Sequence, residues 1–475
     1  MTVTGLLFVI GFFAGLGLAV VRNPMYGLFT YVAVFYLHPP SRWWGHFLPD
    51  LRWSLLAAAV TLLVALRYRS PEPRPSWIST TPARLLLVYT LWLWIQSFWA
   101  IDQAQHLECC ILFTKYLAVF YMVYHLIDSP EKARAFLFVH LAGCLYLGTI
   151  AYSTGGGAGG RLDGVGGPGI DDSNTLGMQM GTAAAVGLAL MIMETRWWMG
   201  FCAVASAFAL NTLVMTGSRG AFLALLAGGL TLVYLHAKRY RKKFVVIGVV
   251  GVLAFGAVAS QQFWERMNTL HAVVDENEQL EDSAESRIVI AKAQLEMAKG
   301  NPAGYGHRGT EALSARYMDR KWLTESGARS SHNTFLTALV EQGIAGAVMY
   351  LAFVAWGIRS MLRIRPILNN AETATIGMYA AAAMSGLAVV LVAGEFADFL
   401  KVEVQIWLAA LVASLFQCAQ AWQERTSAAI SSGSPGGGAV GTAQWKPAYK
   451  SEAARNDAAR SLGSAMSGND RGKPI

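Results

Sequence analysis

Apolar runs alternate with short polar connectors along most of the chain. A helix needs roughly 17–25 apolar residues to cross a bilayer, and several runs reach or approach that length. The thirteen candidate spans are residues 5–21, 25–37, 55–66, 85–99, 111–126, 135–150, 176–193, 200–215, 222–235, 244–259, 335–356, 376–393 and 404–416. Runs 25–37 and 55–66 are short, so the pattern predicts an all-α polytopic membrane protein of about twelve transmembrane helices.

Lysines and arginines gather in four connectors, and the positive-inside bias places such connectors in the cytoplasm. They are Arg67, Arg69, Arg74 and Arg84; Lys132 and Arg134; Lys238, Arg239, Arg241, Lys242 and Lys243; and Arg359, Arg363 and Arg365. The two longest polar segments, residues 154–173 and 261–331, then share the external side. Thirteen spans with a cytoplasmic C-terminus would place the N-terminus outside, whereas two cytoplasmic ends would require twelve.

Composition agrees with a membrane protein. Of 475 residues, 54% are hydrophobic and 14% are charged, against about 25% charged in an average soluble domain. Residues 1–21 lack the basic start and the cleavage site of a signal peptide, so we interpret them as the first span. The net charge of +8 lies largely in short loops and does not indicate nucleic acid. The five cysteines lie in or beside apolar runs, without metal-ligand spacing or a disulfide framework.

Three regions follow from these patterns. Residues 1–420 form the transmembrane domain, and residues 261–331 form a large helical loop subdomain within it. From residue 421 the apolar periodicity stops, and residues 431–438 are a serine- and glycine-rich linker. Residues 421–475 are therefore predicted to be a disordered cytoplasmic tail.

The first external loop is rich in glycine. Residues 155–169 contain closely spaced glycines around a single arginine, Arg161, and are followed by Asp172, Ser173 and Asn174. Glycine lets backbone N–H groups approach a ligand closely, and such loops form anion-binding nests. No Gly-Lys-Ser/Thr follows, so the loop is not a phosphate-binding P-loop. A flexible hairpin is the alternative.

The second external loop is predicted to fold. A capping-box pattern at residues 282–285 and a helix stop at residues 300–302 bound an amphipathic helix, with Arg287 near its start. Its predicted apolar stripe is Ile288, Ala291, Leu295 and Ala298. Arg287 is either an ordinary solvated charge or an anion ligand. The glycine-spaced residues 304–309 follow no predicted strand, so they do not indicate dinucleotide binding.

Two further polar features lie at the ends of apolar runs. Arg219 sits in a Ser-Arg-Gly turn, where it either pairs with a carboxylate such as Glu395 or Asp398 or serves a ligand. His332 lies where the long polar loop meets run 335–356, in the predicted first turn of a helix, with Ser330 and Ser331 as candidate N-caps. A neutral imidazole at such a boundary can accept a proton near pH 7. The alternative is a histidine that only marks the interface.

Together these pieces resemble the O-antigen ligase and polymerase superfamily (WaaL/Wzy-type). The matching features are Arg161 with Asp172-Ser173-Asn174, Ser218-Arg219-Gly220, Ser286-Arg287, and Ser331-His332-Asn333 followed by Glu341-Gln342-Gly343. The resemblance covers residues 85–420, and its specificity comes from the order, spacing and shared side of motifs that are individually weak. The early spans are closer to the branch of exosortase-associated O-glycosylation ligases.

The resemblance implies a multi-pass glycosyltransferase of the bacterial inner membrane, with a periplasmic active site and no metal or other cofactor. Its donor would be a glycan on undecaprenyl diphosphate and its acceptor a lipid A–core oligosaccharide, within membrane lipid. Arginine forks match phosphate oxygens, so Arg161 and Arg287 would hold the diphosphate, with Arg219 as a third contact or a brace. Asp172 and Asn174 would belong to the same substrate site. His332 would be the general base in a single inverting displacement.

Three alternatives remain at this point. An O-antigen polymerase would use a second lipid-linked glycan as acceptor, and a protein O-oligosaccharyltransferase would use Ser or Thr. A transporter or flippase would carry ionisable residues deep inside its spans, as well as internal repeats. Lys115 and His140 are the few such residues, and the sequence has no evident repeat. Enzymatic chemistry at one membrane face is therefore the favoured interpretation.

Overall fold

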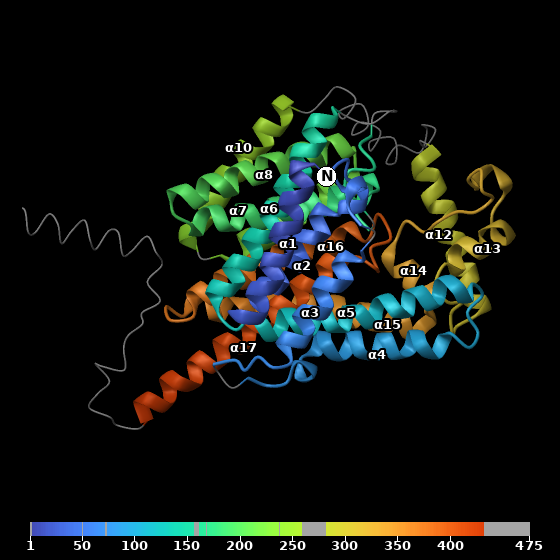
Figure 1. Ribbon diagram of the computed structural model, residues 1–475. Coiled ribbons are helices and arrows are strands. Elements are labelled where there is room, and N and C mark those ends of the chain that lie inside the picture. Colours follow the sequence, from blue (N-terminus) through green and yellow to red (C-terminus); the bar gives the residue numbers. More distant parts are fainter. Residues whose placement is uncertain are drawn as a thin grey trace, which may run out of the picture.

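Helices are the regular structure throughout the residues that the computed structural model describes, which are 2–49, 51–71, 74–155, 161–167, 169–236, 238–258 and 282–431 (Figure 1). The α-helices are α1 (Val3–Val21), α2 (Met25–Leu37), α3 (Trp53–Ala65), α4 (Thr81–Gln96), α5 (Gln103–Leu126), α6 (Pro130–Thr154), α7 (Ser173–Met193), α8 (Arg196–Thr216), α9 (Arg219–Leu235), α10 (Lys238–Val258), α12 (Asp282–Gly300), α13 (Gly309–Tyr317), α14 (Thr334–Glu341), α15 (Gly343–Asn369), α16 (Ala374–Ala393) and α17 (Glu403–Ser431). The all-α prediction is confirmed for this part of the chain.

Each predicted apolar run falls on a helix. Among the described helices, eight are long and apolar enough to cross a membrane, namely α1, α5, α6, α7, α8, α15, α16 and α17. Helices α3 and α9 are apolar but shorter. The chain is thus a multi-pass helical membrane protein, and the predicted count of about twelve spans is not confirmed.

Several predicted features lie partly or wholly outside the described residues. These are residues 156–160 and 168 of the glycine-rich run, residues 261–281 of the long polar loop, and the tail beyond residue 431. The predicted start of the tail at residue 421 is wrong, because α17 continues to Ser431. There the Trp422 indole donates a hydrogen bond of 3.3 Å to the carboxylate of Glu372, which helps to hold this last stretch of helix.

Helices α7, α16 and α17 form the centre of the bundle, and most of their apolar residues are buried inside the protein. Small residues let the helix backbones approach one another closely there. A Cβ on Gly228 of α9 would lie 2.6 Å from Val389 of α16, and a Cβ on Gly187 of α7 would lie 2.2 Å from Ser206 of α8. These close crossings fix the central helices from which the functional loops emerge.

The first helices lie antiparallel. A Cβ on Gly15 of α1 would meet Thr30 of α2, and the ring of Phe8 lies 5.3 Å from that of Trp44. His38, the residue after α2, lies against Gly167 of the glycine-rich loop. The N-terminal end of α1 is therefore at the same end of the bundle as residues 161–167, which we call the loop end. An N-terminus at the loop end agrees with the alternative of thirteen spans, which places the N-terminus on the side of the long polar loops.

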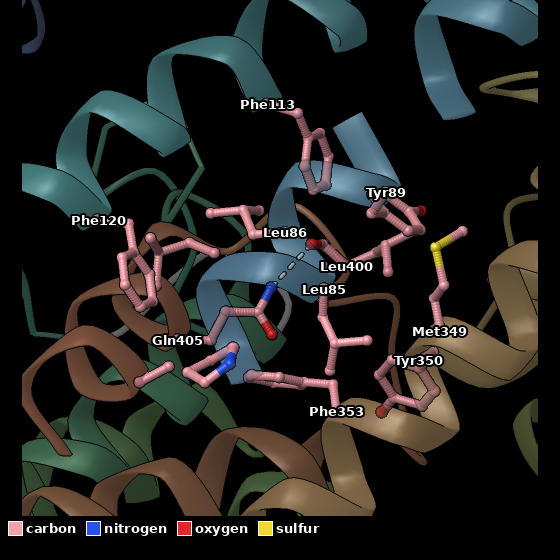
Figure 2. A pocket seen from close by; sticks show the side chains of 13 residues that line it. Leu85, Leu86, Tyr89, Phe113, Phe120, Met349, Tyr350, Phe353, Leu400 and Gln405 are labelled. Atoms are coloured by element: carbon pink, nitrogen blue, oxygen red, sulfur yellow. Dashed lines mark hydrogen bonds between the residues drawn. The ribbon is translucent and has the colours of Figure 1, made fainter. Parts of the chain in front are cut away.

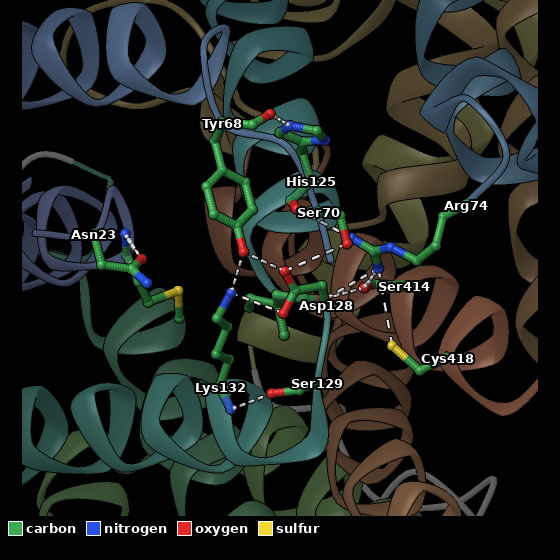
Figure 3. A network of polar contacts seen from close by, with 12 residues as sticks. Asn23, Tyr68, Ser70, Arg74, His125, Asp128, Ser129, Lys132, Ser414 and Cys418 are labelled. Carbon is green, nitrogen blue, oxygen red and sulfur yellow. Dashed lines mark hydrogen bonds and ion pairs between the residues drawn. The ribbon is translucent and has the colours of Figure 1, made fainter. Parts of the chain in front are cut away.

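A polar network holds the opposite end (Figure 3). The Tyr68 hydroxyl donates to Asp128 at 2.6 Å, and Lys132 pairs with Asp128 at 2.8 Å and donates to Tyr68 at 2.8 Å. Arg74 donates to two backbone carbonyl groups in the last turn of α5, at 3.1 and 3.0 Å. Cations at a helix C-terminus stabilise its unpaired carbonyl groups. The network joins two of the basic connectors for which the sequence predicts the same side.

The predicted helix over residues 335–356 is divided. Helix α14 ends at Glu341 and α15 begins at Gly343, whose φ is +70°. A Cβ on Gly343 would lie 2.3 Å from the carbonyl oxygen of Pro302, so the break accommodates a loop that passes directly beside it. The Trp92 indole donates to the carbonyl group of Gln342 at 2.8 Å and satisfies it at the break.

Helices α12, α13 and α14 lie together at one side of the bundle (Figure 1). The amphipathic helix predicted over residues 282–300 is present as α12, but its predicted apolar stripe is wrong. Ile288 and Leu295 are 44% and 47% exposed, whereas Ile290, Ala293 and Met297 are buried. Helices α13 and α14 cover the side of α12 that carries the buried three, and this packing determines the orientation of Arg287 and of the neighbouring Ser286.

Candidate active site

Arg161 is held between the ends of two helices at the loop end. Its Nε donates to the carbonyl oxygen of Thr216, the last residue of α8, at 3.1 Å, and its Nη2 donates to Oδ1 of Asn174 at 3.1 Å. The same amide oxygen accepts a bond of 3.0 Å from the hydroxyl of Ser218, the N-cap of α9. Asn174 thus joins Arg161 to the Ser-Arg-Gly turn.

Carboxylates shape the rest of this loop. Asp172 is the N-cap of α7, and its Oδ1 accepts from the N–H groups of Asn174 and Thr175 at 2.9 and 3.1 Å. Its Oδ2 accepts from the Thr175 hydroxyl. Asp163 accepts from the N–H of Ser173 at 2.6 Å. Unpaired N–H groups at a helix start favour such acceptors, so the acidic residues of the motif serve to begin α7 beneath Arg161.

Sequence reasoning missed Arg42, which clamps the loop from the N-terminal side. Its side chain is buried and donates to the carbonyl oxygens of Val165 at 2.7 Å and Gly166 at 3.0 Å. Gly167 follows with a φ of +117°, a backbone conformation that side chains disfavour, and lies against His38. The sequence around Arg42 does not distinguish it from an arginine that simply lies at the membrane interface.

His332 precedes α14 rather than lying in its first turn. The helix begins at Thr334, and its N-cap is Asn333, whose Oδ1 accepts from the N–H of Leu336 at 2.9 Å. The predicted cap Ser331 instead forms a local turn with Asn333, donating to its carbonyl group at 3.0 Å and accepting from its N–H at 3.2 Å. The imidazole is therefore carried by the segment that leads into the helix.

The charges of three arginines act on His332. The pKa of its imidazole is lowered from 6.5 to about 4, first by burial and then by the positive charges of Arg287, Arg329 and Arg161, in that order. These guanidinium groups come from α12, from the segment before α14 and from the glycine-rich loop. The structure thus brings together three of the predicted site residues, Arg161, Arg287 and His332, and keeps the ring neutral at pH 7.

Arg329 is a member of this group that sequence reasoning missed. Its Nη2 donates to the hydroxyl of the buried Ser286 at 2.8 Å, and its backbone N–H donates to Ser314 of α13 at 3.0 Å. Its buried Nε has no hydrogen-bond partner among the described residues. The one feature of the sequence that could have pointed to Arg329 is its position three residues before His332.

Arg219 is the first residue of α9 and follows the N-cap Ser218. Asn174 links Ser218 to Arg161, so the turn that carries Arg219 adjoins the site. Glu395, one of its predicted ionic partners, accepts a hydrogen bond of 3.0 Å from the side chain of Asn333. A role for Arg219 as phosphate ligand or brace stays a prediction.

Part of the chain is similar to a known protein family. Residues 204–351 match the family model described as O-antigen ligase (Wzy_C). This match supports the resemblance of the chain to the O-antigen ligase/polymerase superfamily. No curated protein matches the sequence. The matched segment contains Arg219, Arg287, Arg329 and His332, while Arg161 lies before it.

A second polar site lies beside the His332 segment. It is a cavity of about 300 Å³, and Ser331 is among the ten described residues that line it. In its wall His307 contacts Glu341 at 3.0 Å and Lys401 at 3.0 Å. Burial and then the negative charge of the neighbouring Glu341 raise the pKa of Asp398, also in the wall, to about 6. No periodic pattern in the sequence indicates this convergence.

An apolar hollow of about 70 Å³ lies among α4, α5, α15 and the start of α17 (Figure 2). Leu85 of α4, Phe113 of α5 and Phe353 of α15 line it, together with Leu400 from the segment before α17. Leu400 faces the hollow and the next residue, Lys401, lines the polar cavity. A polar and an apolar binding surface therefore meet at one point of the chain.

Groups that bind metal ions are dispersed in the part of the chain that the structure describes. Within the described ranges, no three His, Cys, Asp or Glu side chains converge as ligands of one ion. All five cysteines are buried free thiols. The charged groups placed to meet an anionic substrate are the arginines around His332.

Proposed function

We propose that the protein is an O-antigen ligase of the bacterial inner membrane. In this proposal it transfers a glycan from undecaprenyl diphosphate to a hydroxyl group of a lipid A–core oligosaccharide at the periplasmic face. The observation that carries the proposal is the convergence of Arg161, Arg287 and Arg329 upon the neutral ring of His332. Clustered positive charges attract an anionic ligand, and a neutral imidazole beside them can act as a base.

The arginines suit a diphosphate leaving group. Guanidinium forks bind phosphate oxygens in bidentate fashion and remain charged at any physiological pH. As the glycosidic bond breaks, negative charge grows on the diphosphate, and cations already in place stabilise that charge without reorganisation. Arg161 and Arg287 are the principal ligands in this scheme, and Arg329 is the third.

His332 is the proposed general base, and its strength depends on the donor. In the free protein burial and the arginine charges hold its pKa at about 4, which leaves the ring neutral but weakly basic. A bound diphosphate balances those charges and thereby raises the pKa toward the range in which a base works well at pH 7. The imidazole thus becomes an effective base only when the donor is in place.

The transfer is a single displacement. The acceptor hydroxyl oxygen forms a bond to the anomeric carbon while its proton passes to His332. The bond between that carbon and the diphosphate oxygen breaks, and its electron pair leaves with undecaprenyl diphosphate. One displacement inverts the configuration at the carbon, and no metal ion is required because the arginines supply the positive charge.

The other predicted substrate residues take supporting roles in this proposal. Asn174 orients the Arg161 guanidinium through its amide oxygen, and Asp172 fixes the start of the helix that carries Asn174. Arg219 extends the cationic surface from the adjoining turn. The prenyl chain lies along the apolar outer surface of the bundle.

The direct test uses purified protein, a glycan on undecaprenyl diphosphate, and lipid A–core as acceptor, with EDTA present. We expect transfer with inversion by the wild type and by His46→Ala, which alters an exposed histidine elsewhere at the loop end. His332→Ala is expected to lose transfer while keeping its expression and membrane insertion. Loss of wild-type activity in EDTA, or normal transfer by His332→Ala, would contradict the mechanism.

A further inference from the structure

The cavity beside Ser331 differs in kind from the site around His332. Binding sites for small molecules are mostly apolar and span about 300–1,000 Å³. This cavity has a volume of about 300 Å³, yet all ten described residues that line it are polar or charged. Its size suits a small ring, and its lining offers hydrogen bonds instead of apolar contact.

The charges of the lining are mixed. Three carboxylate residues face two permanent cations and one imidazole: Glu311, Glu341, Asp398, Lys401, Arg308 and His307. A diphosphate would be repelled by the carboxylates, whereas it is attracted by the arginines around His332. A neutral ligand with many hydroxyl groups can donate to the carboxylates and accept from the cations at the same time.

Part of the cavity wall is fixed in advance. His307 contacts both Glu341 and Lys401, each at 3.0 Å, and its backbone N–H donates to Nδ1 of His106 at 2.9 Å. Glu341 and His307 are buried. Side chains held in this way lose little conformational entropy when a ligand binds, which favours specific recognition.

The position of the cavity relates it to the reaction. Ser331 lines the cavity and is the chain neighbour of His332, and neighbouring Cα atoms are about 3.8 Å apart across a trans peptide bond. On the other side Lys401 lines the cavity and Leu400 lines the apolar hollow (Figure 2). The segment before the candidate base and the segment that contributes to the apolar hollow therefore both supply residues to the cavity wall.

We propose that this cavity is the acceptor subsite and that it binds a sugar ring of a membrane-anchored glycan. The inference rests on the proposed function, because it assigns the second substrate of the same transfer. Peptide acceptors are usually held by apolar anchor pockets or by exposed backbone edges, and the described lining offers neither. The acceptor hydroxyl therefore belongs to a saccharide and not to a serine or threonine of a protein.

Gln105 provides a test from the wall opposite the His332 segment. It lies in the first turn of α5 and lines the cavity, whereas Gln103 on the same turn is exposed and does not line it. Gln105→Trp fills the cavity without touching the segment before α14, and Gln103→Trp is the matched control. Asp398→Asn is a second variant of unchanged size, because asparagine keeps an oxygen that accepts from the N–H of Leu400.

Binding is measured for the full chain in lipid nanodiscs with three probes: core oligosaccharide released from lipopolysaccharide, undecaprenyl diphosphate, and a serine/threonine-rich peptide. We expect Gln105→Trp and Asp398→Asn to weaken oligosaccharide binding at least tenfold, and the KM for lipid A–core to rise equally in the transfer assay. Undecaprenyl diphosphate should bind both variants as it binds the wild type. Gln103→Trp should change neither oligosaccharide binding nor the KM for lipid A–core.

Each result has a separate meaning. Oligosaccharide binding that survives both cavity variants, or wild-type protein that binds the peptide alone, would overturn the acceptor subsite and leave the donor assignment standing. Wild-type protein that fails to bind undecaprenyl diphosphate would overturn the proposed function. A lipid-linked glycan used as acceptor in place of lipid A–core, with the same loss in the variants, would support the subsite and identify a polymerase.

Discussion

The amide oxygen of Asn174 accepts a hydrogen bond of 3.1 Å from the guanidinium of Arg161. This bond connects the first turn of α7 to the glycine-rich loop. A lone arginine among glycines has many conformations available, and this acceptor together with the carbonyl oxygen of Thr216 removes most of them. The position of the proposed phosphate ligand is thus determined by neutral groups.

We expect Asn174→Leu to raise the KM for the lipid-linked donor about tenfold with a smaller change in kcat. A hydrogen bond to a charged group contributes about 1.5–3 kcal/mol, and its loss frees Arg161. Asn174→Asp keeps an acceptor oxygen and should stay close to the wild type. Steady-state kinetics at varied donor concentration measures both, and an unchanged KM in Asn174→Leu would contradict this role of Asn174.

The pH dependence of transfer should differ between free and donor-bound protein. In the free protein the His332 pKa is about 4, so kcat/KM should fall only as the pH approaches that value. With saturating donor the diphosphate offsets the arginine charges, so kcat should fall at a higher pH. Coincident acidic limbs in the two profiles would argue against the coupling.

The lowered pKa of His332 also affects the stability of the folded protein. The pKa of His332 is lowered in the folded protein from an ordinary 6.5 to about 4. Protonation between these two values therefore favours the unfolded state, and stability is lost as the pH falls through this window. Thermal unfolding in nanodiscs between pH 7 and pH 4 should show a smaller loss for His332→Gln than for the wild type. Equal losses would mean that the ring is not held neutral.

Arg329 should matter to both substrate binding and the basicity of His332. Arg329→Ala should weaken undecaprenyl diphosphate binding about tenfold and raise the pH at which kcat/KM falls, because one positive charge near the imidazole is gone. Arg329→Lys keeps the charge but not the fork, so the pH profile should be retained while binding weakens. Arg316→Ala on the exposed side of α13 is the control. A pH profile unchanged in Arg329→Ala would refute its proximity to His332.

The break between α14 and α15 depends on glycine. Gly343→Ala should destabilise the protein by at least about 1–2 kcal/mol, the usual cost of a side chain in the left-handed region, because φ is +70° and a Cβ would meet the carbonyl oxygen of Pro302. Gly17→Ala adds the same methyl group to α1 where nothing lies within 4 Å. The melting temperature should fall for Gly343→Ala and should stay unchanged for Gly17→Ala.

Much of the fold could be predicted because spanning helices need long apolar runs. The same pattern could not show the break at Gly343, since it arises from the approach of residues 302–304, which are distant in sequence. It also misplaced the buried face of α12. Ile288 and Leu295 have the right spacing for a core stripe, but α13 and α14 cover the face with Ile290 and Met297.

The candidate site, like the fold, has residues that the sequence could predict and others that it could not. Arg161, Arg287 and His332 could be chosen from sequence because each stands out against glycines, a helix start or an apolar run. Arg329 could not, because it is one of several charges in a polar loop and only its contact with Ser286 orients it. Asp172 had the right position and a different role, since its carboxylate caps α7.

The reactive centre draws on the loop before α7, on α12 and on the segment before α14. During synthesis the guanidinium groups therefore emerge well ahead of the imidazole. In the proposed mechanism a nascent chain halted between them would bind a lipid-linked glycan without a general base to activate water. The order of these residues along the chain would then delay hydrolysis of the donor until His332 has emerged.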